Sequence, residues 1–206
     1  MKFGISRTAA ILSGTLLSGA LLVACTPAAE APEAEPTAAT ASADRFVAAD
    51  FAVPTLVETE GFKVVPLGPD LAEIDYEAYM SSIEHLQETF TRSTGWPNAD
   101  LTDEDAMKDM ENEAGRFERR ESFAYAVLTP DGARERGCIY VYPGIGEYDA
   151  VVRLWVTKAE YDAGFDDDLY AWTQDWIARE WPFESVAYPG RAIAWDEWDA
   201  LNKAKD

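Results

Sequence analysis

Basic residues are scarce in this sequence, and histidine and cysteine are almost absent. The 206 residues carry 17 Lys and Arg against 38 Asp and Glu, with one His, two Cys and a formal net charge of −21. Nucleic-acid binding needs clustered Lys and Arg to neutralise phosphates, so this balance excludes a nucleic-acid partner. A Cys/His zinc site needs about four ligands. Since the sequence has only three such residues, we expect no metal site.

Apolar and aromatic residues, by contrast, are plentiful. Hydrophobic residues make up 48% of the chain and aromatic residues 12%, which suffices for a sizeable core and excludes a wholly disordered chain. The length favours one domain with a tail, and no internal repeat is visible. We therefore expect a single acidic, aromatic-rich domain.

The first 24 residues have the pattern of an export signal. Lys2 and Arg7 give a positive start, and the 16 residues from Ala9 to Ala24 carry no charge. Such a run is short for a spanning helix, which needs roughly 20 residues. The run ends in Leu-Val-Ala-Cys25, which resembles the lipobox of bacterial lipoproteins, and this resemblance implies that Cys25 is lipidated. We expect a cell-envelope protein held on a membrane by Cys25; the alternative is an ordinary signal in which Cys25 is incidental.

Residues 25–45 form the next segment, which is rich in Ala, Pro and Glu. From Thr26 to Asp44 it has no aromatic or branched aliphatic side chain, so it cannot offset the entropy of ordering and is expected to be a disordered tether. Residues 46–206 then form the globular domain. With Cys25 lipidated, Cys138 has no partner for a disulfide, and we expect it to be a small buried residue rather than a nucleophile.

Periodicity and turn residues predict the elements of the domain. In chain order these are a strand at 61–69, a helix at 71–90, a helix from 102 with a capping box, strands at 122–129, 137–142 and 148–157, a loop, a helix from 166, a strand at 184–188 and a terminal helix at 196–204. Three consecutive strands followed by a helical crossover favour an α/β fold with a mixed sheet and helices packed on it.

This element order resembles the GNAT superfamily of N-acetyltransferases. Several phrases are similar to a bacterial branch of that family, and the resemblance spans about 51–198: SSIEHL at 81–86, FAYAVL at 123–128, GCIYVYP at 137–143 and the strand around Val152 to Val156. It implies a GNAT-like central sheet, shortened at its C-terminus, acyl transfer to a small amine, and acetyl-CoA as the cofactor.

In that family a glycine-rich loop after the fourth strand opens a helix, and its backbone N–H groups hold the cofactor's pyrophosphate. The matching stretch here runs from Thr157 to Asp168, and the resemblance assigns cofactor contacts to Val156, Lys158 and Gly164. Only Gly164 remains of the glycine pattern, and five carboxylates accompany it: Glu160, Asp162, Asp166, Asp167 and Asp168. We therefore expect no bound cofactor, with acetyl-CoA as the cofactor if the fold is still active.

The family's catalytic groups are also incomplete in this sequence. Glu84 and His85 are the candidate catalytic bases, with Glu88 on the same helix face as Glu84; the alternative is a solvated helix surface. No Tyr follows Arg191, so the general acid that the family places near the C-terminus is unassigned. Arg153, within an apolar strand, is expected to pair with Asp149 or with an acid of the loop, or to meet a ligand anion.

Trp96, Trp195 and Trp198 stand outside the predicted core positions and could line a cleft. Aromatic faces rimmed with acids would favour a small cationic or sugar-like ligand. The sequence thus predicts a lipid-anchored cell-envelope protein with an N-acetyltransferase-like fold and a degenerate acyl-CoA loop. The alternative is an active acyl-CoA-dependent N-acetyltransferase acting on a small amine, retained in the cytosol if the N-terminal signal is misinterpreted.

Overall fold

The computed structural model of this chain describes residues 46–203. The predicted signal at 1–24, the lipidated Cys25 and the tether at 25–45 lie outside the described residues. Among residues 46–203, no helix is both long and apolar enough to cross a membrane.

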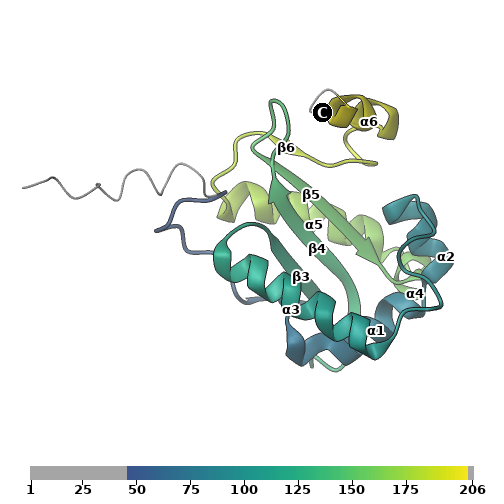
Figure 1. Ribbon diagram of the computed structural model, residues 1–206. Coiled ribbons are helices and arrows are strands. Elements are labelled where there is room, and N and C mark those ends of the chain that lie inside the picture. The colour runs from purple at the N-terminus through teal and green to yellow at the C-terminus, as the bar shows by residue number, and fades with distance from the viewer. Residues whose placement is uncertain (1–45, 204–206) are drawn as a thin grey trace, which may run out of the picture. The chain divides into compact units, whose positions relative to one another are not determined.

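A six-stranded mixed sheet runs through the domain (Figure 1). The strands lie side by side in chain order: β1 (Val57–Glu58), β2 (Lys63–Pro66), β3 (Phe123–Leu128), β4 (Glu135–Pro143), β5 (Ala150–Val156) and β6 (Val186–Ala187). Neighbours from β1 to β5 are antiparallel, whereas β6 runs parallel to β5 after the helical crossover. The predicted α/β class with a mixed sheet is confirmed; the two-residue β1 was not predicted.

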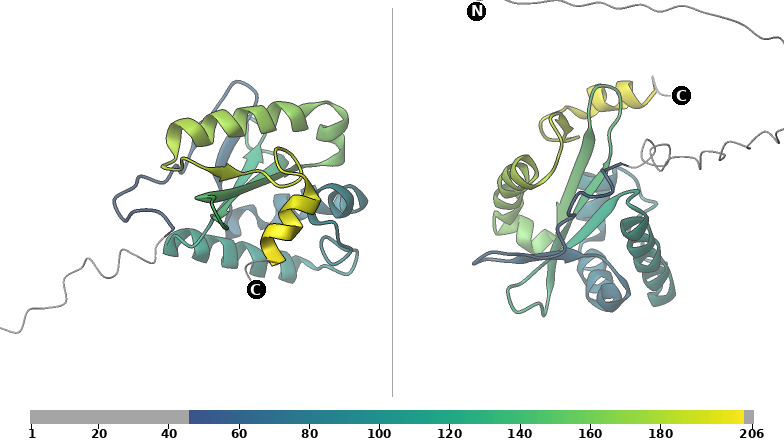
Figure 2. Two further views of the ribbon diagram at one scale, coloured as in Figure 1. Left: turned by 90° about the horizontal axis from the view of Figure 1, so that it is seen from above. Right: turned by 90° about the vertical axis from the view of Figure 1, so that its left-hand side faces the viewer.

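Helices cover both faces of this sheet, with α5 on one face and α1 and α3 on the other (Figure 2). The helical elements are η1 (Pro69–Leu71), α1 (Ala72–Met80), α2 (Ile83–Leu86), the π-helical turn η2 (Gln87–Thr91), α3 (Asp103–Arg119), α4 (Lys158–Asp162), α5 (Phe165–Glu180) and α6 (Trp195–Lys203). The predicted capping box opens α3: the Thr102 hydroxyl accepts from the Asp105 N–H, and the Asp105 carboxylate accepts from the Thr102 N–H.

The alternation of strand side chains divides the core into two layers. On β3, Phe123 and Tyr125 face α5, whereas Ala124 and Ala126 face α1 and α3. The large rings fill the layer under α5, and the small residues let the two helices approach the sheet closely. Cys138 lies in the second layer and is fully buried, as predicted.

Two local predictions were wrong. The single helix expected at 71–90 breaks at Ser81 and Ser82, where Ser82 leaves helical geometry with φ −139°. At the break the Ser81 hydroxyl donates a hydrogen bond to the Ala78 carbonyl oxygen at 2.6 Å. The Ser82 hydroxyl instead accepts a hydrogen bond from the Lys158 N–H at 2.8 Å. The segment after β5, expected to be a loop, contains the helical turn α4. Thr157 caps the start of this turn, because its hydroxyl accepts a hydrogen bond from the Glu160 N–H.

Candidate functional site

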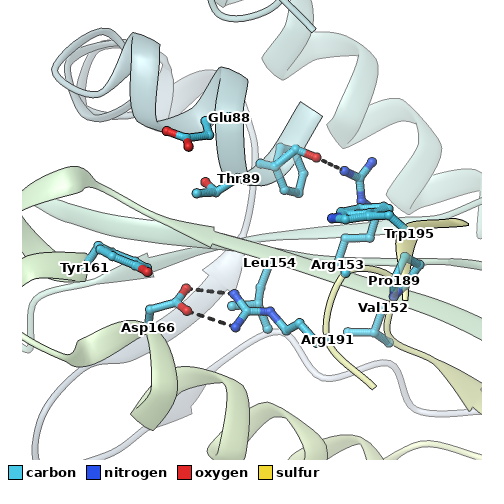
Figure 3. A pocket seen from close by; sticks show the side chains of 12 residues that line it. Glu88, Thr89, Val152, Arg153, Leu154, Tyr161, Asp166, Pro189, Arg191 and Trp195 are labelled. Carbon is cyan, nitrogen blue, oxygen red and sulfur yellow. Dashed lines mark hydrogen bonds and ion pairs between the residues drawn. The ribbon is translucent and has the colours of Figure 1, made fainter. Parts of the chain in front are cut away.

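A cavity of about 290 Å³ opens beside β5 (Figure 3). Only Ala150 and Val151 of β5 pair with β6, so the stretch from Val152 to Leu154 is left uncovered by that strand. The cavity lies along this stretch, between η2, the start of α5 and the segment that follows β6. Its lining residues are Glu88, Thr89, Phe90, Val152, Arg153, Leu154, Tyr161, Asp166, Pro189, Gly190, Arg191 and Trp195.

An ion pair crosses one side of this cavity. Arg191 donates two hydrogen bonds to the Asp166 carboxylate, at 2.9 and 2.7 Å, and its guanidinium lies 4.9 Å from the Tyr170 ring centroid. Asp166 belongs to the first turn of α5, which Gly164 introduces with φ +83°. The positive end of the α5 dipole is therefore faced by a carboxylate of its own chain, and Arg191 neutralises that carboxylate.

Arg153 enters the cavity without a carboxylate partner among residues 46–203. It donates a hydrogen bond to Phe90 O, and its guanidinium lies 4.2 Å from the Phe90 ring centroid and 5.7 Å from that of Trp195. Burial lowers the pKa of this guanidinium. The predicted pair with Asp149 is wrong, because Asp149 accepts from the N–H groups of Glu184 and Ser185 at 2.8 and 2.9 Å.

The residues that the resemblance assigns to the cofactor lie near the cavity but do not line it. Val156 is packed in the core layer under α5, with 1% of its surface exposed. Lys158 pairs with Asp162 at 2.5 Å on the surface of α4. Gly164 provides the left-handed turn between α4 and α5, a conformation that glycine adopts without strain.

Most carboxylates of the 157–168 stretch have cationic partners, which sequence reasoning did not foresee. Glu160 is buried and accepts from Arg134 at 2.6 Å and from Arg136 at 2.5 Å. Burial alone would raise the pKa of Glu160, but these two guanidinium groups hold it below its usual value. Of the five acids only Asp166 lines the cavity, while Asp167 and Asp168 remain exposed.

The candidate bases reach the cavity to different degrees. The His85 ring packs on Tyr161 with 4.8 Å between ring centroids, and Tyr161 lines the cavity. Burial lowers the pKa of His85, and the charge of Lys158 lowers it further. Glu88 lines the cavity, whereas Glu84 is exposed and does not. The imidazole of His85 is thus held next to the phenol of Tyr161, a residue of the cavity wall.

A second cavity, of about 310 Å³, lies on the α1 and α3 side, and Phe90 lines both cavities. Its acidic and aromatic lining comprises Asp75, Asp109, Glu113, Tyr79, Phe90, Trp96, Tyr140 and Tyr142. The Tyr79 hydroxyl and one oxygen of Glu113 are buried without a hydrogen-bond partner, and Arg116 binds the other Glu113 oxygen at 2.7 Å. Sequence reasoning missed Asp75 and Glu113, because both belong to helices that carry several acids, and the sequence does not show which acid is buried.

The three tryptophans singled out in the sequence do not meet in one cleft. Trp195 lines the first cavity and Trp96 the second. Trp198 is buried in a third apolar cluster with Val151, Ala187 and Ile193. The predicted aromatic cleft is therefore divided between the two cavities and a separate apolar cluster.

No family model and no curated protein matches this chain. Among solved structures it is similar to the ribosomal-protein-S5-alanine acetyltransferase of Vibrio fischeri, with 15% identity, a TM-score of 0.47, and coverage of 60% of this chain and 67% of the other. RimL, a ribosomal L7/L12 alpha-N-protein acetyltransferase solved with coenzyme A, is 12% identical, with a TM-score of 0.48 and coverage of 60% of this chain and 68% of the other. A Bordetella pertussis protein described as a GNAT-family acetyltransferase is 16% identical, with a TM-score of 0.44 and coverage of 74% of this chain and 86% of the other. The chain is thus similar in structure to several acetyltransferases.

Proposed function

We propose that this chain is a lipid-anchored cell-envelope protein whose N-acetyltransferase-like domain binds a small ligand and does not transfer an acyl group from acyl-CoA. The observation that carries the proposal is the pair between Asp166 and Arg191 at the start of α5. In the family that the sequence resembles, this helix start holds the pyrophosphate. Here a carboxylate stands at that position.

Electrostatics oppose a pyrophosphate at this helix start. An entering phosphate would have to displace Asp166 from Arg191, and it would meet the exposed Asp167 and Asp168 on the same turn. At an effective dielectric of about 20, one like-charge contact at about 4 Å costs about 4 kcal/mol before salt screening. Micromolar binding is worth only about 8 kcal/mol, so even a screened repulsion from these carboxylates would weaken it strongly.

The second cavity supports a small organic cation as the ligand. Its wall combines three carboxylates with five aromatic side chains, a combination that attracts ammonium groups through charge and through the faces of the rings. The unpartnered Glu113 oxygen and Tyr79 hydroxyl supply a hydrogen-bond acceptor and a donor there. Arg116, which binds the other Glu113 oxygen, is the one basic residue of the lining.

An active acyl-CoA-dependent N-acetyltransferase is the second candidate, and two observations favour it. Arg153 is a guanidinium without a carboxylate partner in the described part of the chain, so it could hold an anion in the first cavity. His85 and Tyr161 lie together at the mouth, where an imidazole could accept a proton and a phenol could donate one. This candidate requires the Asp166–Arg191 pair to open.

The test is an acyl-transfer assay on the mature protein with acetyl-CoA and a panel of small primary amines, following release of the coenzyme A thiol. We expect no release above the buffer rate. Calorimetry with butylamine as the probe should show saturable binding that Glu113→Gln weakens at least about tenfold, with Glu84→Gln, an exposed acid outside both cavities, as the matched control. Turnover that Arg153→Met abolishes would establish the second candidate instead.

The anchor needs its own experiment, because Cys25 lies outside the described residues. The sequence supports lipidation through the Leu-Val-Ala-Cys25 motif and the acidic tether that follows it. Cys25→Ala should release the protein from the membrane fraction or block removal of the signal. Normal maturation and membrane recovery of that variant would show that Cys25 is not the anchor.

A further inference from the structure

A register shift in β4 turns Glu135 toward the interior. Val127 pairs with Gly137, but the next residue, Leu128, pairs with Glu135, so Arg136 is an extra residue in β4. In regular alternation Glu135 and Cys138 would face opposite sides of the sheet. The bulge places them on one side, where the Cys138 thiol donates to Glu135 Oε1 at 2.9 Å.

Helix α1 brings a second carboxylate to the same place. Asp75 Oδ1 lies 3.6 Å from Cys138 Sγ, and one donor atom from each of Asp75, Glu135 and Cys138 falls within 4.8 Å of the others. Their exposed fractions are 3%, 1% and 0%. Among residues 46–203 no Lys, Arg or His forms an ion pair with any of them, so two buried carboxyl groups share one site without a protein cation.

The hydrogen-bonding capacity of this cluster is incompletely used. Glu135 Oε2 is buried and has no hydrogen-bond partner. The hydroxyl of Tyr79, one turn after Asp75 on α1 and 2% exposed, is likewise without one. A buried polar atom without a partner costs about 1–3 kcal/mol and is uncommon in a folded domain. Asp75 lines the second cavity, and Glu135 lines another of about 250 Å³.

We propose that Asp75, Glu135 and Cys138 bind one divalent transition-metal ion of the zinc type. Two carboxylate oxygens and one thiolate form a mixed donor set that suits such an ion, whereas Mg²⁺ and Ca²⁺ prefer six or more oxygen ligands. Three protein ligands leave a fourth tetrahedral position for water or for a ligand in the second cavity. The sequence analysis expected no metal site because it counted only Cys and His as ligands. It did not consider a set of two carboxylates and one thiolate.

Metal binding at this cluster must release protons. The thiol loses its S–H proton when the metal–sulfur bond forms, and any proton held by the two carboxyl groups also passes to the buffer. The metal affinity should therefore increase with pH across the neutral range.

The experiment is a titration of the metal-stripped mature protein with Co²⁺ as a spectroscopic probe, followed by displacement with Zn²⁺. We expect one Co²⁺ per chain, the intense visible absorption of a four-coordinate ion and a thiolate-to-cobalt charge-transfer band. Cys138→Ser should remove that band. Its loss would show that the thiolate belongs to Cys138 and not to Cys25. Glu135→Gln should weaken binding at least about tenfold, and Asp167→Asn, an exposed acid elsewhere, should leave it unchanged.

The spectrum of Cys25→Ala, in which Cys138 is the one remaining cysteine of the sequence, decides the proposal even if the other variants fold poorly. A six-coordinate spectrum without a thiolate band, or no saturable binding, would show that protons alone neutralise the cluster and would overturn the proposal. A band that persists in folded Cys138→Ser would overturn it as well. A positive result is independent of whether acyl-CoA binds at the start of α5.

Discussion

Arg191 and Asp166 join the C-terminal segment to the first turn of α5 through two hydrogen bonds between side chains 25 positions apart in the sequence. Arg92 pairs with Asp199 of α6 at 2.7 Å and lies 4.2 Å from the ring centroid of Trp195, which lines the first cavity. The segment after β6 is therefore fixed at both ends by guanidinium groups. The wall of the cavity depends on charge as well as on packing.

The buried Glu160 of α4, which pairs with Arg134 and Arg136, should contribute much more to the free energy of unfolding than the exposed pair of Lys158 and Asp162 on the same helix. Glu160→Gln leaves Arg134 and Arg136 without their carboxylate, and breaking a buried pair in this way costs about 3–5 kcal/mol. Because Arg134 is half exposed, we expect the lower end of that range. Asp162→Asn, which removes the exposed partner of Lys158, should change the free energy of unfolding by less than about 1 kcal/mol. Urea denaturation of both variants measures the difference, and equal losses would contradict it.

His85 should titrate below the usual histidine range. It is the single histidine of the sequence, so one imidazole titration curve by NMR reports on it without assignment. Burial against Tyr161 and the charge of Lys158 both lower its pKa from 6.5. Lys158→Met should move the midpoint upward by removing the second contribution. A midpoint at or above 6.5 in the wild type would show that the ring is solvated.

The metal-free protein should lose stability as the pH rises through about 6. Burial raises the pKa of Asp75 from 3.8 to about 6, so the folded state holds this proton more tightly than the unfolded state. The associated stability is fully present below about pH 3.8 and is lost as the pH rises through about 6, an effect of about 1–3 kcal/mol. Asp75→Asn should reduce this dependence between pH 4 and 7 without abolishing it, because burial also raises the pKa of Glu135; unfolding experiments performed with a chelator measure the difference.

Local patterns predicted those parts of the fold that local physics determines. The capping box at Thr102, the strand at 122–129 and the burial of Cys138 follow from side chains within a few residues of each other. The break at Ser82 was not predictable, because the apolar spacing continues through Ile83 and Leu86, and the partner of Ser82 is the backbone of Lys158, 76 residues away. Long-range contacts decided this element against its own periodicity.

The site was less predictable than the fold for the same reason. Glu135 reaches the interior only through a bulge at Arg136, which no turn residue or spacing indicates. Arg153 was expected to pair with a carboxylate or to meet a ligand anion. In the structure η2 folds over it and supplies the ring and carbonyl of Phe90. The carboxylates after β5 were recognised, yet their cationic partners Arg134 and Arg191 come from other elements of the chain.

Calorimetric titration of the mature wild-type protein with acetyl-CoA at physiological salt tests the central claim most directly. Because Asp166 occupies the start of α5, we predict no saturable heat in the micromolar range. Asp166→Asn removes that carboxylate and frees Arg191 for a phosphate, so it should raise the affinity measurably, while Asp162→Asn on the surface of α4 should not. Micromolar binding of acetyl-CoA by the unmodified protein would contradict the account and favour a working acyltransferase.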